Sequence, residues 1–396
     1  MSHAERIIGI PGLEINRVVR DKGIEVWAKP SFRPKCPHCD YDHLIIKATH
    51  PRTVKHTRQG NQVLTLHLQV PKYHCRQCGR YFRHRFAAIK PRYRSTEFYR
   101  LEVFEAHNGG ISQRQISRTH NVSPATVERW YQYHIGRKRA EIARRSCPRV
   151  LGIDEHFFTR KKGYATTLVD LKNHKVFDVK LGRSEPSLRP YLRALQGRDQ
   201  VQIVVMDLSE TYRSIARSYF PNAMIVADRF HVVRLINQHF LRVWHQQHPE
   251  AKGNRGLLSL MRRHEWRLKT DQYVNLMAYL DDFPILKVLY KAKQRLMRFI
   301  LLKTLTAKRA RAKLPEYFDL LDQLEVSPLR GLVKTLRSWM EPIIAMWRFR
   351  KSNGITEGFH NKMEMMSRRA YGFRNFENYR LRVLVHCGWN GIINRV

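Results

Sequence analysis

Residues 204–234 read VVMDLSETYRSIARSYFPNAMIVADRFHVVR. A short apolar run, typical of a buried strand, ends at Asp207. A second run ends at Asp228, three residues before His231, and an upstream run, VLGID, ends at Asp154. Three apolar strands that each deliver an aspartate at the carboxyl end predict an α/β sheet with an acidic, metal-dependent site.

The segment that begins near residue 149 predicts the element order βββαβαβ. RVLGIDEHFF, YATTLVDLKN and KVFDVKLG have strand patterns, RSEPSLRPYLRAL is expected to be a helix, and strand, helix and strand follow through AMIVAD. This is the order of the RNase H-like fold, in which the first and fourth strands lie side by side. We therefore expect Asp154 and Asp207 to meet. Adjacent carboxylates repel each other, and their hard oxygen atoms favour Mg²⁺ or Mn²⁺ as the relieving cation.

The local alternative to Asp154 is Glu155. As the next residue on a strand, Glu155 is expected to point to the opposite face of the sheet. A single carboxylate is more often a solvated surface charge than a metal ligand. Two that each end an apolar strand favour the functional interpretation.

The third carboxylate is expected from a helix in the carboxyl-terminal region, SNGITEGFHNKMEMMSRRAYGFRNFENYRLRVL. Asn353, Glu357 and Asn361 follow i, i+4, i+8 and are expected to share one helical face. Glu357 is the preferred third ligand, and Glu364, one turn further on, is the alternative.

The charge balance indicates a polyanionic partner. The 396 residues, enough for more than one domain, include 73 Lys plus Arg against 33 Asp plus Glu, a net charge of +40. No apolar run approaches the roughly 20 residues that a membrane-spanning helix needs. The opening MSHAERIIGIPGL lacks a signal-peptide apolar stretch. We expect a cytoplasmic protein whose six cysteines are metal ligands or reduced thiols.

Two C-x-x-C pairs, Cys36–Cys39 and Cys75–Cys78, predict a structural zinc site. Each pair places two thiolates on one tight turn, and four thiolates complete a tetrahedron; a redox pair or chance spacing is the alternative. The alternating apolar residues of VLTLHLQV, between the pairs, indicate a half-buried strand. Upstream, INRVVR and IEVWAK flank a turn, which predicts a hairpin. We expect a β-type zinc ribbon.

A helix-turn-helix is predicted next, in ISQRQISRTHNVSPATVERWYQYH. Ser112 can cap the second helix of a three-helix segment, and Ser123 can cap the third with Pro124 at its first position. The third helix is expected to enter the DNA major groove; a helical linker is the alternative. The residues expected to contact DNA are Ser123, Ala125, Thr126, Glu128 and Arg129.

Between His231 and residue 352 the chain is rich in Leu, Lys, Arg and Met at helical spacing. We expect an all-α insertion that holds DNA by phosphate contacts and assists dimer assembly. Trp244 and Trp266 lie in it and are expected to be packing aromatics.

Over nearly its whole length the chain resembles the DDE transposases of bacterial insertion sequences, of the ISL-three family. The resemblance rests on the C-x-x-C pairs, the helix-turn-helix, GIDEHFF, VVMDLSETY, ADRFH and, most specifically, the carboxyl-terminal stretch from residue 352. It implies a DDE triad of Asp154, Asp207 and Glu357. It also implies cleavage at the terminal inverted repeats of the element and transfer of the 3′-hydroxyl ends into target DNA.

The resemblance also implies a role for His231 and binding partners for the chain. Asp228-Arg-Phe-His231 is similar to a [C/D]-x-x-H motif of related transposases, which implies that His231 positions the scissile phosphate or a flanking nucleotide. A buried structural histidine is the alternative. Double-stranded DNA is the implied partner, with a homodimer or larger assembly on synapsis, in a nucleoid-associated bacterial protein. The rival functions are a non-catalytic, transposase-derived DNA-binding regulator and a structure-selective nuclease that does not join strands.

The expected fold class is multidomain α+β, with an RNase H-like α/β catalytic domain interrupted by the insertion. The expected domains are the zinc ribbon, the helix-turn-helix, the first part of the catalytic core, the all-helical insertion, and the catalytic helix that completes the core. They span residues 1–92, 93–146, 147–234, 235–350 and 351–396.

Overall fold

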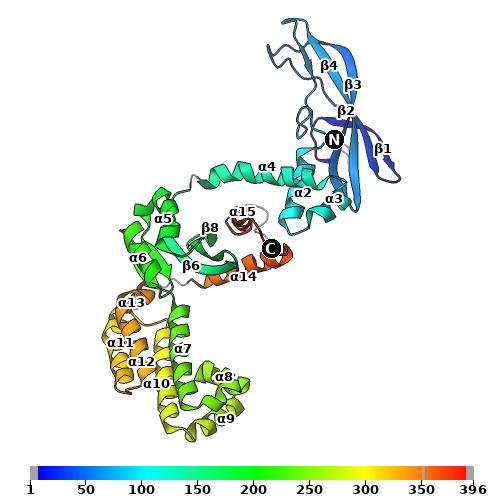
Figure 1. Ribbon diagram of the computed structural model, residues 1–396. Helices are drawn as coiled ribbons and strands as arrows, with labels where there is room; N and C mark the ends of the chain where they lie inside the picture. The colour runs from blue at the N-terminus through cyan, green and yellow to red at the C-terminus, as the bar shows by residue number, and fades with distance from the viewer. Residues whose placement is uncertain (1–7, 144, 350–352, 389–396) are drawn as a thin grey trace. The chain divides into compact units, whose positions relative to one another are not determined.

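The computed structural model describes residues 8–143, 145–349 and 353–388, and the chain forms two compact units, Met1–Ala143 and Arg144–Val396 (Figure 1). Both units combine helices with a five-stranded sheet. Residues 1–7, part of the stretch examined for a signal peptide, and residues 350–352, where the insertion is expected to end, lie outside this description. Among the described residues, no helix has the length and apolarity to cross a membrane.

Two antiparallel hairpins build the sheet of the first unit. The strands are β1 (Leu13–Arg20), β2 (Ile24–Pro30), β3 (Leu44–Gln59), β4 (Gln62–Cys75) and β5 (Tyr81–Arg83). Their order is β1-β2-β4-β3, with β5 beside β4. The predicted hairpin of β1 and β2 is confirmed, and β3 and β4 form a second one. The alternation in β4 is confirmed because Leu64, Leu66, Leu68 and Val70 are buried.

Three helices follow the sheet: α2 (Glu97–Asn108), α3 (Gln113–His120) and α4 (Pro124–Ala143). The predicted caps are confirmed, because Ser112 Oγ accepts from the backbone N–H of Gln115 and Ser123 Oγ accepts from that of Thr126, both at 3.2 Å. Asn121 turns the chain between α3 and α4 in the left-handed conformation, φ 47°. The last helix continues well beyond His134, where the expected motif ends.

The sheet of the second unit has the predicted βββαβαβ order. Its strands are β6 (Val150–Thr159), β7 (Gly163–Asp170), β8 (Lys175–Leu181), β9 (Ile203–Met206) and β10 (Met224–Ala227). Helix α5 (Glu185–Ala194) and the short helix η1 (Arg198–Gln200) precede β9, and α6 (Glu210–Tyr219) precedes β10. The sheet order is β10-β9-β6-β7-β8, so the first and fourth strands are neighbours, as expected.

From Arg229 to Phe349 the described chain is helical. The α-helices are α7 (Arg229–Gln247), α8 (Arg255–Arg262), α9 (Thr270–Asp281), α10 (Pro284–Leu301), α11 (Ala307–Asp322), α12 (Ser327–Ser338) and α13 (Met340–Phe349). Two short helices, η2 (Pro249–Gly253) and η3 (Glu265–Arg267), lie among them. Trp244 is fully buried, which agrees with a packing role, whereas Trp266 is 41% exposed and stacks on His264.

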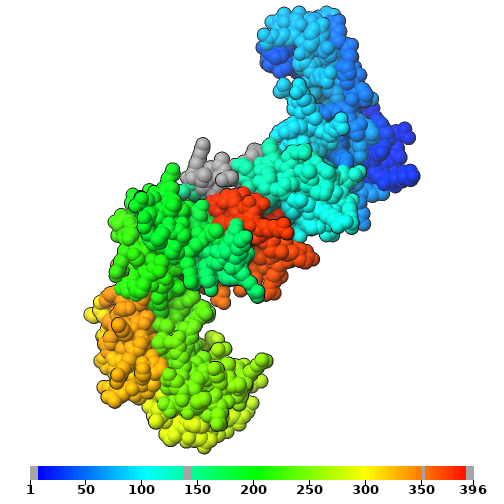
Figure 2. Space-filling view, in the orientation of Figure 1, coloured from blue at the N-terminus to red at the C-terminus, as the bar shows by residue number. Residues whose placement is uncertain are grey.

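The chain then returns to the sheet. Helix α14 (Gly354–Arg369) packs against β6, and α15 (Phe376–Cys387) packs against β8. In Figure 2 the red surface of these helices lies directly against the green surface of the sheet. The bidentate ion pair between Arg380 and Asp178, at 2.6 and 2.9 Å, fastens α15 to β8. The strands before the long helical segment and the helices α14 and α15 after it therefore pack together.

Candidate active site

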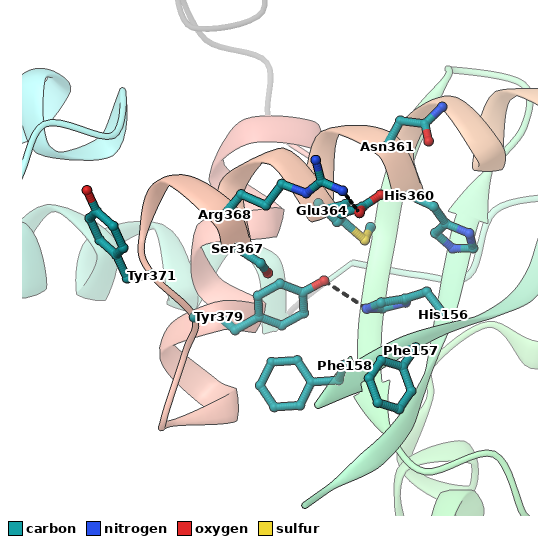
Figure 3. A pocket seen from close by; sticks show the side chains of 12 residues that line it. His156, Phe157, Phe158, His360, Asn361, Glu364, Ser367, Arg368, Tyr371 and Tyr379 are labelled. Carbon is teal, nitrogen blue, oxygen red and sulfur yellow. Dashed lines mark hydrogen bonds and ion pairs between the residues drawn. The ribbon is translucent and has the colours of Figure 1, made fainter. Parts of the chain in front are cut away.

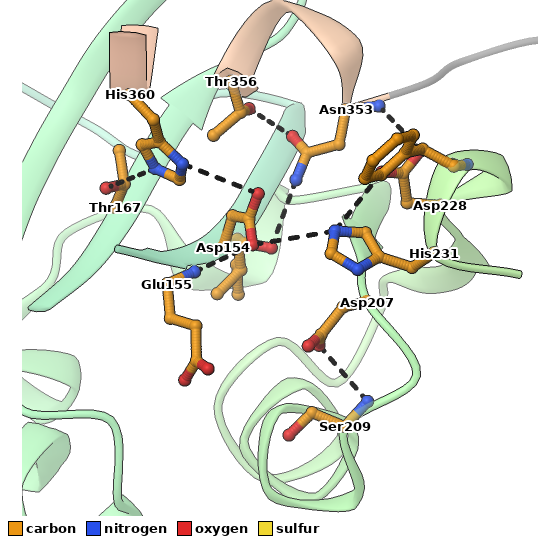
Figure 4. A network of polar contacts seen from close by, with 12 residues as sticks. Asp154, Glu155, Thr167, Asp207, Ser209, Asp228, His231, Asn353, Thr356 and His360 are labelled. Carbon is orange, nitrogen blue, oxygen red and sulfur yellow. Dashed lines mark hydrogen bonds and ion pairs between the residues drawn. The ribbon is translucent and has the colours of Figure 1, made fainter. Parts of the chain in front are cut away.

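Three aspartates gather at one edge of the second sheet (Figure 4). Strands β6 and β9 are parallel with Ile153 opposite Met206, and Asp154 and Asp207 are the next residues on each. Strand β10 is parallel to β9, with Ala227 opposite Met206, so Asp228 joins them. Strands β9 and β10 end at this level, whereas β6 continues to Thr159, so Asp154 lies within its strand and not at the carboxyl end that the sequence predicted. The parallel register of the three strands brings the three aspartates to one site.

Burial and mutual repulsion perturb these carboxylates. The pKa of Asp154 is raised to about 6, because burial removes water from the carboxylate and because Asp207 and Asp228 add negative charge; His231 opposes the shift. Burial also raises the pKa of Asp207 and the pKa of Asp228, and His231 again opposes it. A divalent cation would relieve the same repulsion, so the donor set fits Mg²⁺ or Mn²⁺.

His231 lies in the first turn of α7, between two of the aspartates. Its Nε2 is 3.9 Å from Asp154 Oδ1 and 3.8 Å from Asp228 Oδ2. The helix begins at Asp228, whose carboxylate accepts from the backbone N–H of Phe230 at 3.4 Å. A cavity of about 190 Å³ reaches the ring from the solvent side. Its lining is Asp207, Leu208, His231, Arg234, Leu235 and Gln238.

The first turn of α14 is hydrogen-bonded to the ends of two strands. The backbone N–H of Asn353 donates to Asp228 Oδ1 at 3.3 Å, and its side-chain amide donates to the carbonyl of Ile153 at 3.4 Å. The hydroxyl of Thr356 donates to Asn353 Oδ1. A Cβ at Gly152 would lie 2.6 Å from that oxygen, so only glycine permits this approach.

Glu357 is exposed and lies near enough to Asp228 to contribute to the raised pKa of that carboxyl group. Asn361 is also exposed, whereas Asn353 is buried at the start of the helix, so the three residues expected on one face differ in environment. The alternative carboxylate, Glu364, forms an exposed ion pair with Arg368 at 2.6 Å.

The carboxylates surround the site without forming a closed set of ligands. Among the described residues, the four cysteines form the one group of three or more Asp, Glu, His or Cys side chains whose ligand atoms all lie within 4.8 Å. The carboxylate oxygens of Asp154, Asp207 and Glu357 therefore do not all lie within that distance of one another.

Glu155 turns away from Asp154 and pairs with Arg183 at 3.2 Å, as strand alternation predicts. The charge of Glu155 nevertheless contributes to the raised pKa of Asp207, so Glu155 still interacts electrostatically with the acidic site.

Four residues at the site were missed by sequence reasoning: His360, Thr167, His156 and Tyr379. His360 Nδ1 is 4.0 Å from Asp154 Oδ2, and its Nε2 is 3.1 Å from Thr167 Oγ1. Thr167 Oγ1 is 2.9 Å from His156 Nδ1, and His156 Nε2 is 2.8 Å from the hydroxyl of Tyr379. Strand alternation carried a signal, because residue 156 lies two positions after Asp154 and on the same face.

Burial favours the uncharged form of both histidines of this group. Burial lowers the pKa of His156 to about 3 and the pKa of His360 to about 4, and nearby histidines, His360 and His231 respectively, lower them further. Both rings, with Tyr379, also line a cavity of about 620 Å³ on the other side of His360 (Figure 3). Exposed Phe157 and Tyr371 contribute to its rim.

In the first unit, the four cysteines form two similar turns. Asp40 and Gly79 each adopt the left-handed conformation, and their backbone N–H groups donate to the carbonyls of Cys36 and Cys75. The sulfur pairs Cys36–Cys78 and Cys39–Cys75 are 3.7 and 3.5 Å apart. The pKa of Cys75 is lowered to about 7, chiefly because the backbone of Cys78 donates a hydrogen bond to its sulfur. Four such thiols are compatible with a structural zinc site.

On α4, the residues expected to contact DNA differ in exposure. Ala125 and Arg129 are exposed, as is Ser123 at the cap. Thr126 and Glu128 are half-buried. The carboxylate of Glu128 accepts hydrogen bonds from the side chains of Gln113 and Gln132, at 2.5 and 2.8 Å, and so fastens α3 to α4.

Comparison with known proteins agrees with this arrangement. The transposase for insertion sequence element IS1001 from Bordetella parapertussis is 23% identical over 396 residues, which cover 96% of each chain. The model of the ISL3 family of DDE transposases, described as "Transposase", matches residues 151–383. This match spans more than half of the chain and contains the three aspartates, His231 and α14, and it shows that the chain belongs to the ISL3 family of transposases.

Proposed function

We propose that this transposase binds the terminal inverted repeats of an insertion sequence, cleaves DNA at the element ends and transfers the 3′-hydroxyl ends to target DNA. One observation carries the proposal: Asp207 and Asp228 follow the ends of two parallel strands, Asp154 lies at the same level within the neighbouring parallel strand, and His231 lies among them. A purely structural sheet edge has no need for three neighbouring carboxylates whose pKa values are all raised, chiefly by burial.

Asp154, Asp207 and Glu357 are the proposed ligands for two Mg²⁺ or Mn²⁺ ions. Bound ions would activate an attacking oxygen and stabilise the leaving oxygen of a phosphodiester. The side chain of His231 is 21% exposed, and its Nε2 faces the site, so it is placed to hold a phosphate oxygen. Asp228 fixes both His231 and the start of α14, and it thereby sets the position of Glu357.

DNA recognition is proposed for the first unit. A zinc ion held by Cys36, Cys39, Cys75 and Cys78 would fix the ribbon, and exposed Arg129 and Ala125 would face the major groove. The net charge of +40 supports sequence-independent phosphate contacts elsewhere in the chain. Because two element ends must be held together, we propose a homodimer or larger assembly, associated with the nucleoid.

The proposed architecture keeps the domain limits predicted from the sequence: 1–92, 93–146, 147–234, 235–350 and 351–396. The RNase H-like core is supported by the strand order β10-β9-β6-β7-β8 and by the adjacent aspartates. The helices of residues 229–349, which lie between β10 and α14, support an all-α insertion.

The test is a reaction with labelled DNA that carries the element's own ends, in Mg²⁺ or in EDTA. We expect metal-dependent nicks at the end boundary and joined products, both lost in Asp207→Ala. Asp199→Asn, an exposed aspartate on η1, is the matched control and is expected to react like the wild type. Specific binding without cleavage under any divalent metal would instead favour the DNA-binding regulator, and cleavage without joining would favour the nuclease.

A further inference from the structure

A row of four side chains leads from the interior of the second unit to Asp154. It begins at Tyr379 on α15, passes through His156 on β6 and Thr167 on β7, and ends at His360 on α14. The row therefore joins four elements that are separate in the sequence. Thr167 is fully buried and Tyr379 is 2% exposed, whereas His156 and His360 are half-buried beside the cavity of about 620 Å³.

The direction of each hydrogen bond follows from Asp154. An ionised carboxylate only accepts, so a proton belongs on the His360 Nδ1 that faces Asp154 Oδ2. The Nε2 of His360 then accepts from the hydroxyl of Thr167. Thr167 in turn accepts from His156 Nδ1–H, and His156 Nε2 accepts from the hydroxyl of Tyr379. Three of the four donors are then used in hydrogen bonds, and the fourth, His360 Nδ1–H, faces the carboxylate.

We propose that His360 is a positioning residue for Asp154: its Nδ1–H, fixed by Thr167 and by the His156–Tyr379 pair behind it, orients the Asp154 carboxylate for metal binding. The inference rests on the proposed function, because it takes Asp154 as a metal ligand.

The two oxygens of Asp154 have different neighbours, which gives the orientation a physical basis. Oδ1 accepts from the backbone N–H of Glu155 at 2.9 Å and faces His231. Oδ2 faces His360 at 4.0 Å, longer than a hydrogen bond, and such contacts in sites without substrate commonly tighten when the reacting complex forms. The hydrogen bond to Oδ1 already restrains the carboxylate, and tightening of the His360 contact would restrain it on the Oδ2 side as well.

Thr167→Val is the most direct test, because valine has the shape of threonine but removes the hydroxyl that holds both histidines. We expect the Mn²⁺ dissociation constant, measured by electron paramagnetic resonance on the full chain without DNA, to rise by roughly 10- to 100-fold, the usual cost of losing an outer hydrogen bond to a metal site. The Mg²⁺ concentration for half-maximal cleavage of end DNA is expected to rise in parallel.

Thr166→Val is the matched control. Thr166 is the adjacent residue on β7, is 2% exposed, and bonds the carbonyl of Gly182 and the hydroxyl of Tyr212 on the other face of the sheet. The Thr166→Val variant loses an equally buried hydroxyl, so its melting temperature should fall about as much as that of Thr167→Val. Its Mn²⁺ affinity should not change. Thr167→Ser restores the hydroxyl and should restore Mn²⁺ affinity.

A second pair of variants distinguishes the contribution of His360 Nδ1 from that of the contact between His360 and Thr167. His360→Asn retains an amide N–H near the Nδ1 position but not the contact with Thr167, and His360→Ala removes both. We expect weaker Mn²⁺ binding in His360→Ala than in His360→Asn. Equal Mn²⁺ affinity in the wild type, Thr167→Val and His360→Ala would overturn the positioning role.

The same series distinguishes failure of this inference from failure of the proposed function. If Asp154→Asn abolishes both Mn²⁺ binding and cleavage while Thr167→Val and His360→Ala bind Mn²⁺ normally, the function stands and the role of His360 is wrong. If Asp154→Asn cleaves end DNA like the wild type, the assignment of Asp154 as a metal ligand is wrong; if the wild type binds end DNA but does not cleave it under any divalent metal, the proposed function itself is wrong.

Discussion

The backbone N–H of Asn353 donates a hydrogen bond to the carboxylate of Asp228 at 3.3 Å, although 125 positions separate the two residues. Both are buried, at 2% and 3% exposure. The helices α7 to α13 lie between them in the chain. This bond therefore joins the two ends of the long helical segment and holds the start of α14 at the sheet edge. The position of Glu357, one turn into α14, depends on that closure.

Asp228→Ala is predicted to loosen the start of α14 and to reduce cleavage of end DNA by at least tenfold, because both the cap of α7 and the bond to Asn353 are lost. Hydrogen exchange of the backbone amides of residues 353–360 should become faster. Asp228→Asn keeps an oxygen acceptor and should leave that exchange close to the wild-type rate. Unchanged exchange in Asp228→Ala would show that other contacts hold the helix.

Patterns local in the sequence predicted much of the fold and part of the site. Asp154 and Asp207 each end an apolar run, and the βββαβαβ order alone indicated that their strands are neighbours. The caps Ser112 and Ser123 were also evident, because capping depends on residues three positions apart.

Contacts between distant segments could not be read in the same way. The bond from Asn353 to Asp228 and the contact of His360 with Thr167 depend on how α14 packs against β6, and no local periodicity encodes that packing. Helical spacing also treats Asn353 and Glu357 alike, yet the first lies buried at the helix start and the second is exposed.

The four-cysteine site is predicted to hold one zinc ion per chain. Cys36→Ser should lower the zinc content measured by plasma mass spectrometry and lower the melting temperature of the first unit, because metal binding and folding are coupled in such sites. Cys147→Ala, which removes a buried thiol of the second unit, should keep full zinc content. Full zinc content in Cys36→Ser would contradict the assignment.

Arg129→Ala is predicted to reduce the preference of the chain for its end DNA over random DNA by roughly tenfold, since loss of a base-reading arginine costs about 1–3 kcal/mol. Arg118→Ala removes an equal exposed charge from α3. Its effect should be similar on both DNAs, as expected for a phosphate contact. Fluorescence anisotropy at several salt concentrations measures both affinities; equal loss of preference in the two variants would argue against major-groove reading by α4.

Lys293 predicts a pH dependence of stability in the helical segment. Its amine is 2% exposed, and burial lowers its pKa to about 7, against about 10.4 in an unfolded chain. Between these pH values the unfolded state binds more protons, so the free energy of unfolding should rise with pH, by up to about 1.4 kcal/mol per pH unit. Lys293→Met should remove this rise in urea titrations from pH 7.5 to pH 9.

Lys291→Met is the control for that titration. Lys291 lies on the same helix, and its hydrogen bond to Glu265 raises its pKa, so the stability that this lysine contributes is constant below pH 10. The variant should keep the wild-type pH slope. An identical slope in Lys293→Met would mean that Lys293 stays charged in the folded protein.

The most direct test of the acidic site is an anomalous-scattering crystal structure of the chain bound to its end DNA and Mn²⁺. We predict manganese bound to oxygens of Asp154 and Asp207, with Glu357 as the third carboxylate ligand and the end phosphate beside His231. Manganese bound through Glu155 or Glu364 in place of these residues, or end DNA seated at the sheet edge with no ion near Asp154, would contradict it.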